Sequence, residues 1–186
     1  MKAPDIGLKS NTKTTMIGLL NERLAEACAK SPDRFVAFAS VALQFPDLAA
    51  QQLEDGVKKY GLRGAAIGGN VAGAEISDPK FNPFWAKAEE LGVVVFIHPQ
   101  GDGAPDQLNH RFKGNGYLYN VIGNPLETTI ALSHLIFDGT LDRYPKLKIC
   151  AAHGGGFLPS YSGRSDFGCT TRPDLCQGGT HGPIKK

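Results

Sequence analysis

The 186-residue sequence predicts an α/β fold in which short parallel strands alternate with helices. Two patterns support this. Four short, mostly apolar runs are typical of buried parallel strands, and the segments between them carry apolar residues at helical spacing. The helices are expected either to cover both faces of an open sheet or to ring a barrel. A complete (β/α)8 barrel takes about 250 residues, more than four such units supply.

The expected strands are runs of small or β-forming residues next to Gly or Pro, at residues 35–41, 64–68, 93–97 and 147–152. The first of them is expected to be buried on both faces. The expected helices carry an apolar face, and they lie at about residues 15–30, 46–61, 83–92 and 124–137. Pro46 and Pro83 fit the first turn of two of these helices, and Gly61 and Gly92 end the same two.

The helix at 124–137 has a recognisable start. Asn124 is expected to cap it, Pro125 to fit its first turn, and Glu127 to reach back to the cap. Glu127 therefore needs no catalytic role. A long loop over 99–120 precedes this helix, and nothing beyond Gly163 has strong periodicity.

The chain is expected to form one partial domain over residues 1–186, with 1–14 and 177–186 irregular. Its composition, 41% hydrophobic and 20% charged with a net charge of +2, is that of an ordinary soluble globular unit. No apolar run approaches the ~18 residues of a membrane span, and no secretory signal opens the chain. Positive charge forms no stripe, so nucleic acid and membrane are not expected as partners.

The cysteines indicate a reducing, cytoplasmic setting. Four are present without a CxxC pair in a chain with no export signal, and we interpret all of them as reduced thiols. They are Cys28, Cys150, Cys169 and Cys176.

Two histidines directly follow predicted strands. His98 comes after the strand at 93–97, and His153 after the strand at 147–152. Because active sites in parallel α/β architectures lie at the carboxyl ends of the strands, both rings could converge on one metal ion or its bound water. The alternative for each is a plain hydrogen-bonded side chain.

The remaining histidines have simpler explanations. His134 is expected to be a buried or half-buried packing residue on a helix face, and His110 to be exposed in the long loop. His181 lies in the unpatterned tail. Asp102 and Asp106 could touch the site, but their loop placement cannot be read from the sequence.

Several motifs resemble the amidohydrolase-2 family, which contains aminocarboxymuconate-semialdehyde decarboxylase and related aromatic-acid decarboxylases. The strongest is His-Gly-Gly-Gly-Phe-Leu-Pro-Ser-Tyr-Ser-Gly-Arg at 153–164. Phe-Ile-His-Pro at 96–99, Gly-Asn-Pro-Leu-Glu-Thr-Thr at 123–129 and Asp-Arg-Tyr-Pro at 142–145 occur in the family's order. The resemblance covers roughly residues 20–176. It implies a partial (β/α)8 TIM barrel of the metal-dependent hydrolase type, covering about strands three to six.

The resemblance also implies roles for four residues. His98 matches a metal ligand, and His153 matches the histidine that serves as acid or base. Arg164 matches an arginine that binds a substrate carboxylate, in some members across a dimer interface, although a surface arginine after a turn is the alternative. Tyr117 lies near a substrate-stacking aromatic of some relatives.

The implied reaction is decarboxylation or hydrolysis of an aromatic or unsaturated carboxylic acid. Zinc is the expected metal, and manganese is used by some decarboxylases of the family. Hydrolysis of a lactone or amide by the same residues is the alternative reaction.

The sequence departs from the family at both ends. It contains no His-x-His or Glu-x-His pair for a first strand, and no strand ending in aspartate after Arg164. The chain therefore looks like a fragment, either catalytically inactive or a split subunit that needs a partner. Four strands would leave edges unpaired, so self-association into a homo-oligomer is expected.

Overall fold

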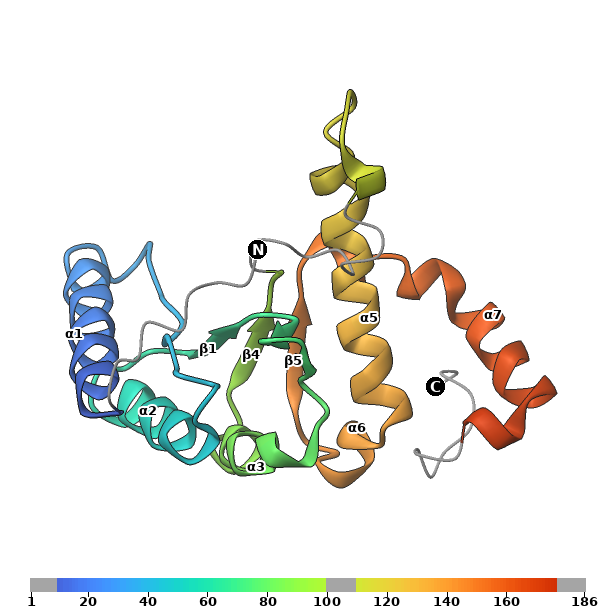
Figure 1. Cartoon of the computed structure of the whole chain (residues 1–186). Coiled ribbons are helices and arrows are strands. Elements are labelled where there is room, and N and C mark those ends of the chain that lie inside the picture. The colour runs from blue at the N-terminus through green and yellow to red at the C-terminus, as the bar shows by residue number, and fades with distance from the viewer. Residues whose placement is uncertain (1–9, 100–109, 177–186) are drawn as a thin grey trace.

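A computed structural model describes residues 10–99 and 110–176. Its main sheet is parallel, in the order β1 (Gly64–Ile67), β4 (Val94–Ile97) and β5 (Lys148–Ala151), as Figure 1 shows. Ala66 aligns with Phe96 and Phe96 with Cys150. The predicted strands at 64–68, 93–97 and 147–152 are therefore confirmed.

The remaining predicted strand, at 35–41, is the first in chain order, and its prediction as a strand buried on both faces is wrong. Ala39 forms a single parallel bridge with Ala65, and the side chains of Phe35 and Val36 are 56% and 67% exposed. The segment meets β1 along only a few backbone hydrogen bonds. Although the segment is rich in β-forming residues, no described strand pairs with its other edge.

The helices follow the predicted order and have the bounds α1 (Ser10–Ala29), α2 (Pro46–Lys58), α3 (Asn82–Leu91), α5 (Asn124–Phe137), α6 (Thr140–Arg143) and α7 (Leu158–Thr171). Because α1 begins at Ser10, residues 10–14 are helical and not irregular as expected. Gly92 ends α3 with a left-handed φ of 62°, as a glycine after a helix commonly does. None of these helices is long and apolar enough to cross a membrane.

Short turns and a small hairpin complete the described chain. The hairpin consists of β2 (Asn70–Val71) and β3 (Ala74–Glu75). The tight 3₁₀ turns are η1 (Pro79–Phe81), η2 (His110–Phe112), η4 (His153–Gly155) and η5 (Pro173–Leu175), and the wider π-helical turn is η3 (Tyr119–Gly123).

The core lies between the sheet and one layer of helices. Val95 and Ile97 of β4 are fully buried against side chains such as Leu53 of α2, Trp85 of α3 and Leu135 of α5. Figure 1 shows α1, α2, α3 and α5 following one another around the sheet. This is the arrangement of a barrel wall, so the alternative with helices on both faces is wrong.

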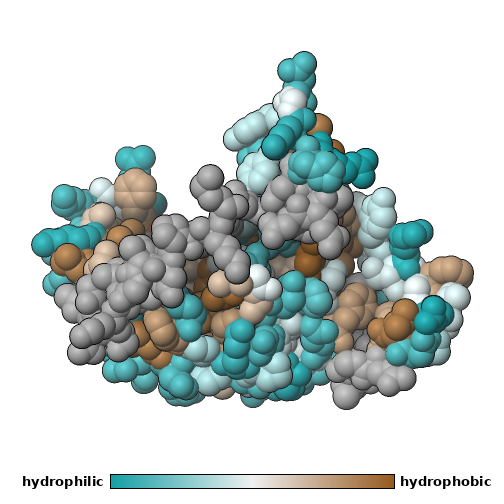
Figure 2. All heavy atoms as spheres, viewed as in Figure 1, coloured by the Kyte–Doolittle hydropathy of each residue, from teal (hydrophilic) through white to brown (hydrophobic). Residues whose placement is uncertain are grey.

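The opposite face of the sheet has no helical cover within the described residues. Ala66 and Cys150 are exposed there, and the Phe96 ring between them is half-buried against Phe38, with ring centroids 6.0 Å apart. Hydrophobic atoms reach the surface near the middle of the view in Figure 2. In a closed barrel this face would point inward; here the barrel wall is open.

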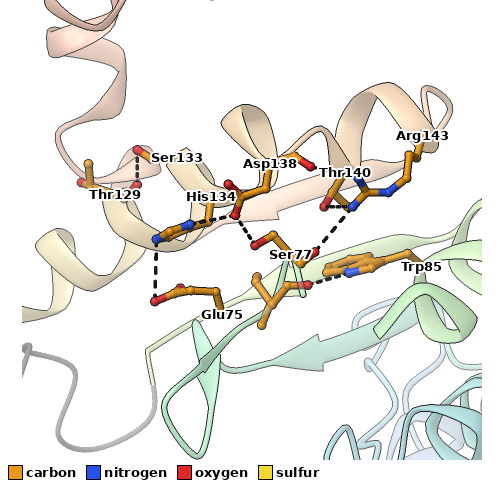
Figure 3. Close-up of polar contacts among 10 residues, drawn as sticks. Glu75, Ser77, Trp85, Thr129, Ser133, His134, Asp138, Thr140 and Arg143 are labelled. Atoms are coloured by element: carbon orange, nitrogen blue, oxygen red, sulfur yellow. Dashed lines mark hydrogen bonds and ion pairs between the residues drawn. The ribbon is translucent and has the colours of Figure 1, made fainter. Parts of the chain in front are cut away.

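The segment around the hairpin packs along α5 through polar contacts (Figure 3). Ser77 donates to Asp138 at 2.6 Å, and His134 lies between Asp138, at 2.8 Å, and Glu75, at 3.8 Å. Trp85 donates from its indole to a backbone carbonyl of the same segment at 2.8 Å. His134 is half-buried as predicted, but its ring makes polar contacts and not apolar packing.

The predicted cap of α5 is wrong. The wide turn η3 runs directly into the helix, and Asn124 has helical φ and ψ angles of −65° and −46°. Its side chain therefore cannot act as an N-cap, which needs extended backbone. Glu127 is turned instead toward Asn70, whose amide donates to it at 2.7 Å. Pro125 does lie in the first turn, as expected.

The C-terminal part also differs from expectation. α7 extends past Gly163 without burying a residue, which explains why no apolar periodicity predicts it. Cys169 and Cys176 form a disulfide, so their expected reduced state is wrong. The turn η5 after α7 folds the chain back and brings their Cα atoms to 5.5 Å. Cys28 and Cys150 are free thiols, as expected.

Candidate active site

His98 lies at the carboxyl end of β4. Its backbone N–H donates to Ile67 O at 3.0 Å and so continues the ladder between β1 and β4. The ring lies near that of Phe96, with centroids 6.2 Å apart, on the open face of the sheet. Its Nδ1 lies 2.7 Å from Pro99 O. A carbonyl only accepts, so Nδ1 carries the proton and Nε2 keeps a lone pair for a metal.

His153 lies at the same end of β5. The preceding residue, Ala152, donates its N–H to Ile97 O at 2.9 Å. His153 itself has a φ of 56°, and Gly154, Gly155 and Gly156 continue with positive φ angles of 61°, 82° and 65°. A positive φ is uncommon outside glycine and costs free energy, which the packing around this turn must offset.

The glycine turn is pressed against the start of α5. A Cβ atom built on Gly156 would lie 2.2 Å from Pro125 O and 2.4 Å from Thr129 Oγ1. Phe157 N donates to that same Thr129 hydroxyl at 2.7 Å. The absence of a side chain at residue 156 therefore lets the turn that follows His153 approach α5 closely.

The structure brings the two strand-end histidines together. The ring centroids of His98 and His153 are 5.1 Å apart. Loss of solvation, and after it the nearby His98 ring, lowers the pKa of His153 below its ordinary value. The neutral ring, which can accept a proton, is thereby favoured at neutral pH.

These residues fit a divalent metal in kind but not in number. Imidazole is a common ligand, and His98 presents a free Nε2, but protein metal sites usually take three or four protein ligands. Within the described ranges, no group of three or more His, Cys, Asp or Glu side chains could hold an ion. Further ligands would have to come from outside these ranges.

Arg164 is not brought together with the histidines. It is exposed on α7 and lines a groove of about 480 Å³ between α5 and α7, beside Phe157 and Tyr161. Neither His98 nor His153 lines that groove. Arg164 and the two histidines therefore line no common groove among those found in the described residues.

The other residues considered from the sequence lie around the site or outside the described ranges. Tyr117 is 71% exposed on the turn before η3 and has a φ of 51°. His110 is exposed, as expected. Asp102, Asp106 and His181 lie outside the described residues.

Sequence reasoning missed Thr128. It is fully buried on α5, and its Oγ1 lies 3.1 Å from His153 Nδ1. The only signal in the sequence was its place in the motif at 123–129, because the 25 residues that separate the partners give no periodic pattern.

A family model described as Amidohydrolase matches residues 9–168. The chain is 37% identical over 157 residues to 2-amino-3-carboxymuconate-6-semialdehyde decarboxylase of Dictyostelium discoideum, covering 84% of this chain and 42% of the relative. It is 33% identical over 156 residues to gamma-resorcylate decarboxylase of Rhodococcus jostii strain RHA1, covering 78% and 47%.

A solved structure agrees with the fold. The 5-carboxyvanillate decarboxylase of Novosphingobium aromaticivorans, crystallised with manganese and 3-methoxy-4-hydroxy-5-nitrobenzoic acid, superposes with a TM-score of 0.83 at 29% identity. The match covers 96% of this chain and 51% of that one. The chain thus spans about half the length of the proteins that it matches.

Proposed function

We propose, from the premise that this chain belongs to the amidohydrolase family, that it carries part of the active site of a metal-dependent decarboxylase for an aromatic or unsaturated carboxylic acid. The observation that carries the proposal is the pair of strand-end histidines, His98 and His153, with ring centroids 5.1 Å apart. The decarboxylases among its relatives favour this reaction over lactone or amide hydrolysis.

His98 is the proposed metal ligand. Its Nδ1 donates to Pro99 O, which leaves Nε2 unprotonated, as a metal ligand requires. The sequence predicts zinc, whereas the 5-carboxyvanillate decarboxylase structure contains manganese, so the proposal is for a divalent ion of either kind. The described residues supply too few ligands to hold the ion by themselves.

His153 is the proposed proton carrier. In decarboxylation, the bond between the carboxylate carbon and the substrate carbon breaks, the electron pair stays on the substrate carbon, and carbon dioxide leaves. A proton then takes the place of the carboxylate. A neutral His153 can accept a proton from water or a substrate hydroxyl and, once protonated, deliver it to that carbon.

Arg164 and Tyr117 stay proposed substrate contacts. Since Arg164 lines a groove that excludes both histidines, we propose that it serves the site of another copy in a homo-oligomer. An Arg fork suits a carboxylate because its N–H groups can bind both oxygens. A cytoplasmic location is also part of the proposal, although the disulfide at Cys169 removes one argument for it.

The test combines metal analysis with turnover. The purified chain is loaded with manganese or zinc, and carbon dioxide release is measured with γ-resorcylate, 5-carboxyvanillate and 2-amino-3-carboxymuconate-6-semialdehyde. His98→Ala is expected to lower metal content. His153→Ala is expected to retain the metal and lower turnover about 10²–10⁴-fold, the usual contribution of a general acid or base.

His110→Ala is the matched control, because it removes an exposed histidine from η2 and should change neither quantity. Equal loss of metal from His98→Ala and His153→Ala would show that the two roles are wrongly assigned.

The second candidate function is that of a subunit that is catalytically inactive by itself and acts only with a partner. The open sheet face and the short supply of ligands within the described residues favour it. Metal content near zero, with no turnover after metal is added, would support this candidate and reject autonomous catalysis.

A further inference from the structure

One buried hydroxyl connects α5 to the His153 ring. Thr128 Oγ1 lies 3.1 Å from His153 Nδ1 and also donates to Asn124 O, one turn earlier in the helix, at 3.1 Å. Thr128 is fully buried, so water does not reach its hydroxyl, whereas His153 at the other end of the contact is exposed. The hydroxyl has one proton and must serve two neighbours.

The chemistry of these neighbours determines where that proton lies. Asn124 O is a carbonyl and can only accept, so the hydroxyl proton points to it. With that proton directed to Asn124 O, the lone pairs of Thr128 Oγ1 face the His153 ring, where a protonated His153 Nδ1 can donate to them. A neutral imidazole carries one proton, so Nε2 is left without one.

The backbone around this contact is held in place. Thr129, the next residue of α5, donates to Pro125 O at 2.7 Å and accepts from Phe157 N at 2.7 Å. The glycine turn that carries His153 therefore touches the same helical turn as Thr128. The hydrogen bonds of Thr129 thus join the turn that carries His153 to the helical turn that carries Thr128, and they keep the two side chains at a fixed separation.

We propose that Thr128 is a positioning residue that holds His153 in the tautomer with a protonated Nδ1 and an unprotonated Nε2. The inference rests on the proposed function, because it concerns the residue assigned there to proton transfer. It adds the direction of transfer. Nε2 is the atom that accepts the proton, and Nδ1 is kept from the substrate by its bond to the helix. His98 shows the same pattern, with Nδ1 donating to Pro99 O.

The test is the tautomer itself, measured by ¹⁵N–¹H correlation NMR on the metal-free chain at a pH where histidines are neutral. His153→Gln identifies the His153 signals. We expect a protonated Nδ1 in the wild type, a shift toward a protonated Nε2 in Thr128→Val, and the wild-type tautomer in Thr128→Ser, which restores the hydroxyl.

A matched control is Thr171→Val. The Thr171 hydroxyl also donates to the carbonyl one turn earlier, Phe167 O at 2.8 Å, but it lies on α7 and should leave the His153 tautomer unchanged. If the manganese-loaded chain turns over substrate, Thr128→Val is expected to lower its kcat about 10–100-fold and to leave its metal content unchanged. This is the usual effect of losing a partner that orients a ligand.

A protonated Nε2 in the wild type, or the same tautomer in the wild type and in Thr128→Val, would overturn the proposal. If Thr128→Val does not fold, the wild-type spectrum decides. Failure of the proposed function can be distinguished from failure of this proposal, because the His153 tautomer can be measured even in a chain that has neither metal nor turnover.

Discussion

Replacing Gly156 with alanine should disrupt the turn that carries His153, whereas the same change at Gly154 should be mild. Gly154 has φ and ψ angles of 61° and 23°, an ordinary left-handed conformation, and an added Cβ would meet nothing within 4 Å. Gly156 has φ and ψ angles of 65° and −130°, close to the region that is essentially restricted to glycine. Its added Cβ would also collide with Pro125 O and Thr129 Oγ1.

These differences give different magnitudes. At Gly154, only the left-handed backbone is penalised, so Gly154→Ala should lower the free energy of unfolding by about 1–2 kcal/mol. Gly156→Ala carries a backbone penalty of about 1–3 kcal/mol and an overpacking cost of about 1–3 kcal/mol, for a total loss of about 2–6 kcal/mol. Since the collision involves a backbone oxygen of α5, a side-chain rotation cannot relieve it.

The assay is urea unfolding of both variants and the wild type, followed by circular dichroism, together with the His153 ring signals in the NMR spectrum. Gly156→Ala should move those signals because the turn must shift away from α5, whereas Gly154→Ala should leave them nearly in place. Equal losses of stability in the two variants would refute the steric argument and leave only the backbone term.

Two further predictions concern the polar contacts of α5. Burial raises the pKa of Glu127, so its ionisation disfavours the folded state as pH rises above the unfolded value of about 4.3. Glu127→Gln, which can still accept from Asn70, should gain stability relative to the wild type as pH rises from about 4 toward 7, and a constant difference between the two urea unfolding curves would contradict this. Asp138→Ala removes the acceptor of the buried Ser77 hydroxyl and should cost about 1–3 kcal/mol in the same assay, whereas Asp138→Asn, which keeps an acceptor oxygen, should cost less.

The parts of the fold that the sequence predicts are those determined by short-range patterns. The run at 93–97 is continuous in β-forming residues and becomes β4, and Pro83 and Gly92 mark the ends of α3. The histidines follow from the same logic, because a residue directly after a parallel strand lies at the carboxyl edge of the sheet. Because β4 and β5 are neighbours, both histidines lie at one end of the sheet, where their ring centroids are 5.1 Å apart.

The parts that it does not predict depend on contacts between distant residues. Glu127 had a plausible local partner in the cap of its own helix, yet its carboxylate binds Asn70, 57 residues away. The segment at 35–41 has the composition of a strand but pairs with β1 only at Ala39. α7 buries no residue, so its sequence has no apolar face from which the helix could be predicted. In each case a tertiary partner, or its absence, overrides the local preference.

The position of Arg164 leads to a last prediction about assembly. Neither His98 nor His153 lines its groove between α5 and α7, and we propose that the arginine that binds the substrate carboxylate comes from a second copy. Arg164→Ala and His153→Ala should then each be inactive alone. Unfolded together and refolded as a mixture, half of the dimers would pair one variant with the other, and each such dimer would contain one intact site of two. Turnover should therefore recover to about a quarter of the wild-type value, provided that the two copies are related by a twofold axis. If Arg164 acts within its own chain, or only as a surface charge, mixing restores nothing beyond the sum of the two separate variants.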